Sequence, residues 1–240
     1  IGLQDQRAIS QTWRFPELLP PLAHLPAFAG VNVSPRIVEA LVTSLLLATA
    51  TGLASTILGF IVARSAARGS RRTRLATLAL ALFAVVAPPI ALGVGLQVAM
   101  LSVGLSGTLA GVWLAHLVPA IGYLTLFADG VFTTFDFAID DEARTLGASS
   151  WQVLSRLTVP ILKDRLGEGI VLGGLVSWGQ LAITALIGGG LVRTLPVELM
   201  AFVRAGDDRL GAAAGLVLTL PPLLAIGLLQ VGRRRPGASL

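Results

Sequence analysis

The stretch "ALVTSLLLATATGLASTILGFIVA" (residues 40–63) decides the fold, because its 24 residues carry no formal charge. Three further runs share this property, at 75–128, 169–192 and 210–232. A helix needs about 20 apolar residues to cross the hydrocarbon core of a bilayer. Strands of a membrane barrel would be about 10 residues long with alternating polarity, a pattern that this sequence lacks. We therefore expect an all-α membrane protein.

The composition supports this expectation. Charged residues make up 13% of the 240 residues and hydrophobic residues 54%, with a mean hydropathy of +0.81. A soluble domain carries about 25% charged residues. The net charge of +5 does not indicate nucleic-acid binding, because the arginines cluster beside apolar runs and form no stripe along a groove. Without cysteine, the sequence excludes a disulfide framework and a thiolate metal site.

The charge-free runs predict five membrane-spanning helices. The run 75–128 is too long for one crossing, and "LSVGLSG" (101–107) inside it is typical of a tight turn. The expected spans lie near 40–63, 75–100, 108–128, 169–192 and 210–232. Prolines are tolerated inside membrane helices and mark kinks there. Five of them fall in these spans: Pro88, Pro89, Pro119, Pro221 and Pro222.

The arginines predict the orientation of the spans. The segment "RSAARGSRRTR" (64–74) holds five arginines and no acid, and the tail 233–240 begins with three more. Short loops rich in arginine stay in the cytoplasm. The loop 134–165 and the C-terminus then also lie in the cytoplasm, whereas 1–36 and 193–209 lie outside. An outer N-terminal segment without a signal peptide predicts a sixth helix upstream.

The segment "DDEARTLGASSWQVLSRLTVPILKDRL" (140–166) is charged although it lies between apolar spans. Three acids, Asp140 to Glu142, suit the first turn of a helix. Gly147 can end that helix in the left-handed conformation. Ser149 and Gln152 have the spacing of a capping box at the start of a second helix. Pro160 is expected to end or kink that helix.

Two readings of this helical hairpin remain open. Trp151, Leu154 and Leu157 would form an apolar stripe, on which the hairpin could lie at the lipid surface. The stripe could instead dock on another protein. The acids favour the protein, because anionic lipid of the inner leaflet would repel them.

The same segment resembles the cytoplasmic loop of permease subunits of type I, binding-protein-dependent ABC importers, the MetI-like family. That loop reads E-A-A, three residues, G, nine residues, I, one residue, L-P. Here Asp141-Glu142-Ala143 precedes Gly147 at the same spacing, and Leu157, Val159 and Pro160 follow. Asp141 replaces the family's glutamate and Glu142 its first alanine. The similarity extends over about residues 38–230, including "RTLPVELMAFVRAGDD" (193–208).

The resemblance implies a fold, a location and a set of partners. The fold would be a MetI-like helical bundle in which 37–232 form a multi-pass permease domain of the bacterial inner membrane. The partners would be two cytoplasmic ATPase subunits, a second permease, identical or paralogous, and a periplasmic solute-binding protein. ATP and magnesium would bind the ATPases, because this chain has no phosphate-binding G-x-x-x-x-G-K-[ST] motif and is not itself expected to be an enzyme.

The resemblance also implies the residues that couple the permease to the ATPase. In the family, a short helix of this loop docks in a groove of the ATPase and transmits its closure. Charged side chains would pair with the ATPase, and small residues would allow close approach. The residues concerned are Asp141, Glu142, Ala143, Arg144, Gly147, Ala148, Trp151 and Pro160.

The translocation pathway is predicted from polar residues within the spans. Ser177, Gln180 and Thr184 form a polar line in "SWGQLAIT" (177–184), beside which Trp178 could act as a gate; Gln97 is a further candidate. These side chains could instead hold helices together, as polar residues in membranes often do. His116 is expected to pack against a neighbouring helix rather than to bind a ligand.

Two other classes of protein are less consistent with the sequence. An ion-coupled transporter usually has carboxylates or paired charges in the membrane, and the predicted spans have none. An intramembrane serine protease would need Ser106 of "GLSG" beside a histidine, but ten residues of helix separate Ser106 from His116 by about 15 Å. Among importers, the sequence resembles most the branch that serves thiamine, ferric iron and polyamines, followed by oxyanions such as molybdate.

The outer regions offer contacts for a solute-binding protein. They are the segment "WRFPELLPPLAHLPAF" (13–28) and the loop residues Glu198, Arg204, Asp207, Asp208 and Arg209. Charges on a loop more often only face solvent.

Overall fold

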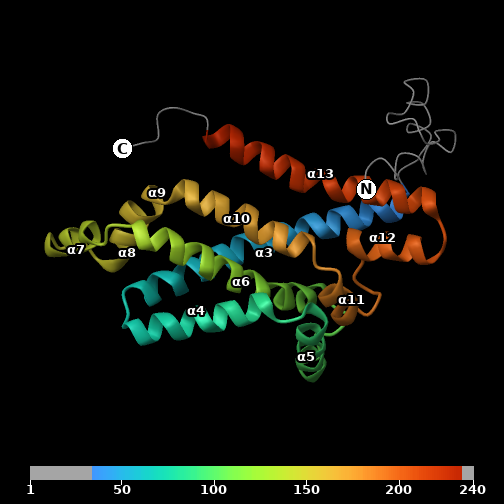
Figure 1. Cartoon of the computed structure of the whole chain (residues 1–240), viewed down its shortest axis with the longest axis horizontal. Helices are drawn as coiled ribbons and strands as arrows, with labels where there is room; N and C mark the ends of the chain where they lie inside the picture. The colour runs from blue at the N-terminus through green and yellow to red at the C-terminus, as the bar shows by residue number, and fades with distance from the viewer. Residues whose placement is uncertain (1–33, 234–240) are drawn as a thin grey trace.

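The computed structural model describes residues 34–233, and all of its regular elements there are helices (Figure 1). This confirms the all-α prediction. The helices of the bundle are α3 (Pro35–Ala67), α4 (Arg71–Val86), α5 (Pro89–Ser102), α6 (Leu109–Thr134), α10 (Lys163–Trp178), α11 (Ala182–Gly188), α12 (Leu195–Arg204) and α13 (Asp208–Arg233). The short α7, α8, η2 and α9 lie between α6 and α10. The predicted outer segment 1–36 and tail 233–240 fall almost entirely outside the described residues.

Helices α3, α6 and α10 pack together along the centre of the molecule (Figure 1). Small residues line the contact between α3 and α10. Gly173 lies so close to α3 that an added Cβ would come within 2.4 Å of Ser55 Oγ. Without a hydrophobic driving force between helices in lipid, small residues stabilise such contacts by letting the backbones approach. This packing forms the scaffold that carries the peripheral helices.

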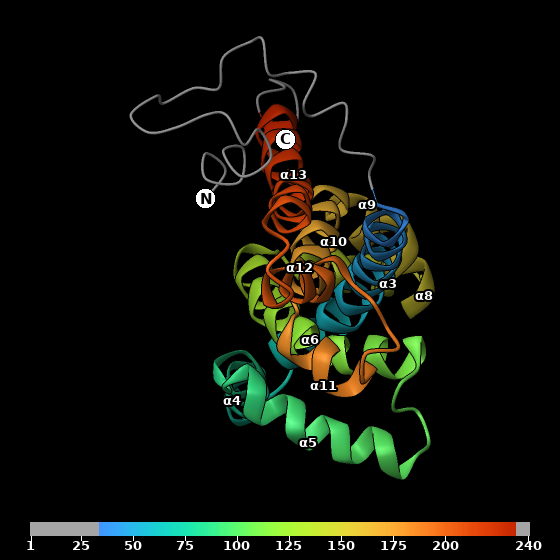
Figure 2. The same ribbon diagram turned by 90° about the vertical axis from the view of Figure 1, so that its right-hand side faces the viewer.

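Two of the predicted spans are not single helices. The segment 75–100 is divided between α4 and α5, which meet at 102° around Ala87 and Pro88. The two prolines at 88 and 89 remove backbone donors at that point. The segment 169–192 is divided between α10 and α11, which meet at 62°. Helix α5 therefore projects from the bundle and packs against α11 (Figure 2).

The number of membrane crossings stays a prediction. Within residues 34–233, α3 and α6 are each long and apolar enough to cross a bilayer. Counting each bent pair as one span raises the number to four, and α13 adds a shorter apolar stretch at 210–225. Pro119 lies inside α6, and Pro221 and Pro222 lie inside α13.

The turn predicted at 101–107 is confirmed. Gly104 and Gly107 both have positive φ, at 71° and 75°. Thr108 then caps α6, because its side chain accepts a hydrogen bond from the Gly111 amide at 3.0 Å.

The segment 193–209, expected as a loop, contains helix α12. Glu198 in its first turn is buried, and its carboxylate pairs with Arg36 at 2.9 Å and Arg193 at 3.6 Å. A glutamate in the first helical turn also interacts favourably with the helix dipole. Glu198 is therefore a structural ion-pair partner and does not simply face solvent.

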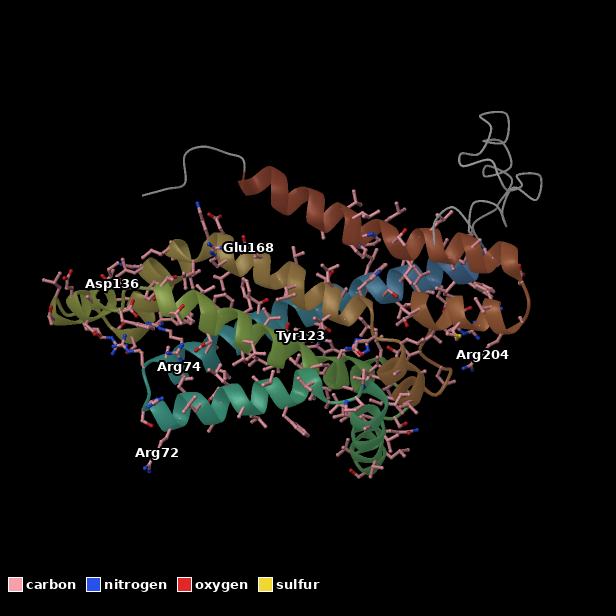
Figure 3. All side chains as sticks on the ribbon, viewed as in Figure 1. Arg72, Arg74, Tyr123, Asp136, Glu168 and Arg204 are labelled. Carbon is pink, nitrogen blue, oxygen red and sulfur yellow. The ribbon has the colours of Figure 1, made fainter. Side chains whose placement is uncertain are left out.

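The arginine-rich turn between α3 and α4 lies at the same end of the molecule as the segment after α6. Figure 3 places Arg72, Arg74 and Asp136 at this end and Arg204 at the other. Arg74 donates two hydrogen bonds to Asp129 of α6, at 2.8 and 3.0 Å. This arrangement agrees with the predicted grouping of 64–74 and 134–165 on one side, while the side itself stays a prediction.

Candidate functional site

The hairpin predicted between α6 and α10 is present as α7 (Ala138–Thr145) and α8 (Ser150–Val153). Gly147 ends α7 with φ of 90°. Its amide donates to the Arg144 carbonyl at 2.9 Å, and the Ala148 amide donates to the Ala143 carbonyl at 3.0 Å. These two bonds form a Schellman motif, which satisfies the last carbonyls of α7. The predicted role of Gly147 in ending this helix is confirmed.

The start of α8 is fixed by the predicted capping box. The Gln152 amide donates to Ser149 Oγ at 3.3 Å, and the Ser149 amide donates to Gln152 Oε1 at 2.8 Å. Both ends of the connection between α7 and α8 are thus held by hydrogen bonds. The hairpin is a defined element and not a loose loop.

A π-helical turn, η2 (Leu154–Thr158), follows α8 and leads into the three-residue α9 (Val159–Ile161). Pro160 lies within α9, where its ring cannot fit an ordinary α-helical ladder. π-helical turns are rare and occur mostly as single turns within α-helices. The predicted kink at Pro160 is therefore a π turn before the proline and a break at Leu162, after which α10 begins.

Of the predicted stripe, Trp151 is exposed, whereas Leu154 and Leu157 are half-buried. Leu146 is 88% exposed and Trp151 is 72% exposed, although both are large and apolar. Val153 is fully buried instead and holds α8 against the body of the protein. The other predicted coupling residues line the exposed side or its edge: Asp141, Glu142, Arg144, Gly147 and Pro160 are exposed, and Ala143 and Ala148 are half-buried.

The base of the hairpin contains a buried carboxylate that the sequence analysis had placed only among the acids of a first turn. The Asp140 side chain is 0% exposed and pairs with Arg64 of α3 and with Arg68, the C-cap residue of α3. Thr158 Oγ1 also donates to Asp140 Oδ1 at 3.2 Å. Arg68 pairs in addition with the exposed Asp141. No periodicity in the sequence indicates that α3 and α7 meet here.

Aromatic rings lie beneath this ion-pair cluster. Phe132 and Phe137 are stacked with their centroids 5.8 Å apart, and Phe60 of α3 lies edge-on to Phe132 at 6.0 Å. The Arg68 guanidinium lies 5.2 Å from the centroid of the Phe137 ring. The base of the hairpin is therefore packed as well as ion-paired.

The second candidate site is the break between α10 and α11. His116 of α6 reaches both sides of the break: its Nδ1 lies 2.8 Å from Ser177 Oγ, and its Nε2 lies 2.9 Å from Thr184 Oγ1. The Thr184 hydroxyl donates to the Gln180 carbonyl at 2.5 Å. All three side chains are buried.

With a neutral imidazole, these contacts are consistent with one set of donors and acceptors. Because the Thr184 hydroxyl proton is used on the Gln180 carbonyl, Thr184 Oγ1 accepts from His116 Nε2–H. In a neutral imidazole, Nδ1 is then the acceptor, and Ser177 Oγ donates to it. Neither hydroxyl has a free proton for a ligand. The arrangement favours helix packing by Ser177, His116 and Thr184, the alternative weighed in the sequence analysis.

Trp178 and Gln97 lie outside this network. The Trp178 ring donates through Nε1 to the Leu218 carbonyl at 3.0 Å. It also lines an open apolar groove of about 840 Å³ between the helix break, α12 and α13. Gln97 is half-buried on the projecting α5. The structure therefore brings Ser177 and Thr184 together but separates Trp178 and Gln97 from them.

The arrangement does not support a serine protease. Ser106 Oγ donates to the Ile187 carbonyl at 3.4 Å and does not contact His116. The serine that does contact His116 is Ser177, but a hydroxyl, and not a carboxylate, lies at the other ring nitrogen. A Ser-His pair without a carboxylate or similar group to orient it lacks the third member of a catalytic triad.

Comparison with known proteins identifies relatives over most of the chain. The molybdenum transport system permease protein ModB of Mycobacterium tuberculosis is 31% identical over 226 residues, which cover 88% of this chain and 84% of ModB. The spermidine/putrescine permease protein PotC of Haemophilus influenzae is 22% identical over 79% of this chain and 74% of PotC. No protein-family model matches the chain.

A solved structure shares the fold. It is the crystal structure of a bacterial alginate ABC transporter in complex with a periplasmic protein bound to an alginate pentasaccharide. A chain of this structure matches with a TM-score of 0.67 at 14% identity, over 96% of this chain and 86% of that one. The relatives are transport permeases, which implies that this chain is not itself catalytic. The chain belongs to the permease subunits of ABC transporters, and its fold is consistent with a MetI-like importer permease.

Proposed function

We propose that this chain lines the translocation pathway of an ABC importer in the bacterial inner membrane, and that its α7–α8 hairpin docks on a cytoplasmic ATPase subunit. The exposure of Leu146 and Trp151 at a hairpin whose helix ends are both capped carries the proposal. Large apolar side chains held in solvent on an ordered element are typical of a docking surface. Asp141, Glu142 and Arg144 surround them with charges that can pair with the ATPase.

The remaining partners follow from the importer family. A second permease, identical or paralogous, would complete the pathway, and two ATPase subunits would bind ATP and magnesium. A periplasmic solute-binding protein would deliver the substrate at the α12 end. The alginate transporter, which was crystallised with its periplasmic protein, supports this part of the proposal.

The substrate we propose is molybdate. Its support is the molybdenum permease ModB, which is 31% identical over most of both chains. We therefore rank an oxyanion ahead of thiamine, ferric iron and polyamines, whereas the sequence alone had ranked those three first. A polyamine is the second candidate, because PotC matches over 79% of this chain.

Uptake by the reconstituted transporter distinguishes these substrates. Proteoliposomes containing this permease, its ATPase and its binding protein are supplied with radioactive molybdate or spermidine, with ATP or with a non-hydrolysable analogue inside. We expect ATP-dependent uptake of molybdate only. ATP-dependent uptake of spermidine alone would replace molybdate with a polyamine, and uptake that does not depend on ATP would contradict an ABC importer.

For the pathway, we propose Trp178 as its main contributor among the predicted residues. Its ring lines the groove beside the helix break, whereas Ser177 and Thr184 are engaged by His116. Trp178→Ala is expected to change the apparent KM for substrate or to allow leakage without ATP. An unchanged KM together with no leakage would show that Trp178 only packs between helices and does not line the pathway.

A further inference from the structure

The ion pairs at the base of the hairpin join three elements that are distant in the sequence. Asp140 belongs to the first turn of α7, and Thr158 to the end of η2. Arg64 lies in the last turn of α3, and Arg68 is the C-cap residue of that helix. One carboxylate accepts from all three side chains. Asp140 is thus the only described side chain of the hairpin that bonds both to the central helix α3 and to the segment returning to α10.

Burial makes the ion pairs of Asp140 costly to break. The Asp140 side chain is 0% exposed, and the Arg64 and Arg68 side chains are 15% and 29% exposed. A buried carboxylate that loses its partners leaves an uncompensated charge, which is strongly destabilising. Separation of α7 from α3 would therefore be costly, whereas surface ion pairs separate at little cost.

The exposed part of the hairpin lies beyond this contact. The connection between α7 and α8 lies at one extreme of the molecule (Figure 1). Exposed Leu146 directly follows α7, and exposed Trp151 lies in the first turn of α8. The Schellman motif and the capping box hold that connection, and the Asp140 cluster holds its base. A force applied at the tip would thus reach α3 through Asp140 without a flexible joint between them.

We infer that Asp140 is a positioning residue that fixes the hairpin to α3, so that the hairpin and the central helix move as one rigid body during transport. The role in transport rests on the proposed docking of the hairpin on the ATPase. The rigid connection itself does not depend on that docking, because it results from contacts within this chain.

The 240 residues contain no cysteine, so two spin labels can be introduced without background from them. One label replaces exposed Leu146 at the tip, and the other replaces exposed Ile57 on α3. Distances between the labels are measured by pulsed electron resonance in the complete transporter in nanodiscs, without nucleotide and after trapping with ATP and vanadate. We expect one narrow distance distribution that is the same in both states.

The variant Asp140→Asn keeps the shape of the side chain but removes its charge. We expect the distribution to broaden or to split, and the two nucleotide states to differ. Asp129→Asn is the matched control, because it removes a carboxylate that pairs with Arg74 at the same end but links α4 to α6. It is expected to leave the distribution narrow. Should Asp140→Asn fail to assemble, Thr158→Val removes one neutral hydrogen bond of the cluster and is expected to give a smaller broadening.

A distribution in Asp140→Asn identical to the original in both states would overturn the inference, as would equal broadening in Asp129→Asn. Cross-linking from the hairpin tip to the ATPase, measured separately, decides the proposed function. A hairpin that stays rigid but captures no ATPase would contradict the docking and not the connection to α3. A hairpin that captures the ATPase but does not stay rigid would contradict only the connection.

Discussion

Gly52 of α3 lies against the backbone of Ile170 in α10, so closely that an added Cβ would be 2.4 Å from the Ile170 carbonyl oxygen. The obstacle is main chain and cannot rotate away. Such overpacking costs about 1–3 kcal/mol. Gly52→Ala should therefore lower the thermal unfolding midpoint of the detergent-solubilised protein.

Gly167 provides the control for this substitution. It lies in the same helix α10, and an added Cβ would meet nothing within 4 Å. Alanine is a better helix former than glycine by about 1 kcal/mol. Gly167→Ala should leave the midpoint unchanged or raise it, and equal losses in both variants would mean that α3 and α10 do not approach as described.

Gly147 tests whether the coupling hairpin needs its left-handed turn. An added side chain would meet no atom within 4 Å, so any loss comes from the backbone conformation at φ of 90°. For a residue with a Cβ this conformation costs roughly 1–2 kcal/mol. Gly147→Val should reduce transport in proteoliposomes without preventing membrane insertion. Gly147→Asn should retain most of it, since asparagine tolerates the left-handed region. Equal transport by the two variants would show that transport does not depend on the left-handed turn at Gly147.

His116 tests whether the polar network at the helix break is structural. His116→Phe would leave the buried Ser177 hydroxyl without its partner, which costs about 1–3 kcal/mol, while Thr184 keeps its hydrogen bond to the Gln180 carbonyl. The thermal midpoint should fall. The triple variant His116→Leu, Ser177→Ala, Thr184→Val removes all the polar partners together and should recover much of the loss. If the triple variant is stable but no longer transports, the network belongs to the pathway after all.

The burial of Glu198 predicts that removing its carboxylate destabilises the protein less than removing the two arginines that pair with it. Removing the carboxylate by Glu198→Gln leaves Arg36 and Arg193 half-exposed and able to reach water. Removing both arginines leaves a buried charge without a cation, which is the costlier change. The double variant Arg36→Ala, Arg193→Ala should therefore have a lower thermal midpoint than Glu198→Gln. The opposite order would show that Glu198 is solvated.

Local signals in the sequence predicted local structure well. Gly147, the Ser149–Gln152 capping box and Gly104 act through hydrogen bonds within a few residues, so their spacing alone defines the turn. The apolar runs likewise predicted the helices, because length and lack of charge are sufficient signals for a helix in lipid.

Long-range features could not be predicted in this way. Asp140 looks like any acid in a first helical turn, and only the packing of α3 against α7 shows that it is buried between Arg64 and Arg68. The apolar stripe indicated Trp151, which is exposed, but not the burial of neighbouring Val153 against the body. Prolines marked the bend between α4 and α5 but not its angle of 102°.

The docking of the hairpin is tested most directly by cross-linking from its tip in intact membranes that contain the whole transporter. A cysteine replaces Trp151, and a second variant carries one at exposed Val203 of α12, at the opposite end of the molecule. The account predicts that Trp151→Cys forms a product containing the ATPase subunit and that Val203→Cys does not. An assembled, ATP-hydrolysing transporter in which Trp151→Cys never captures the ATPase would contradict it.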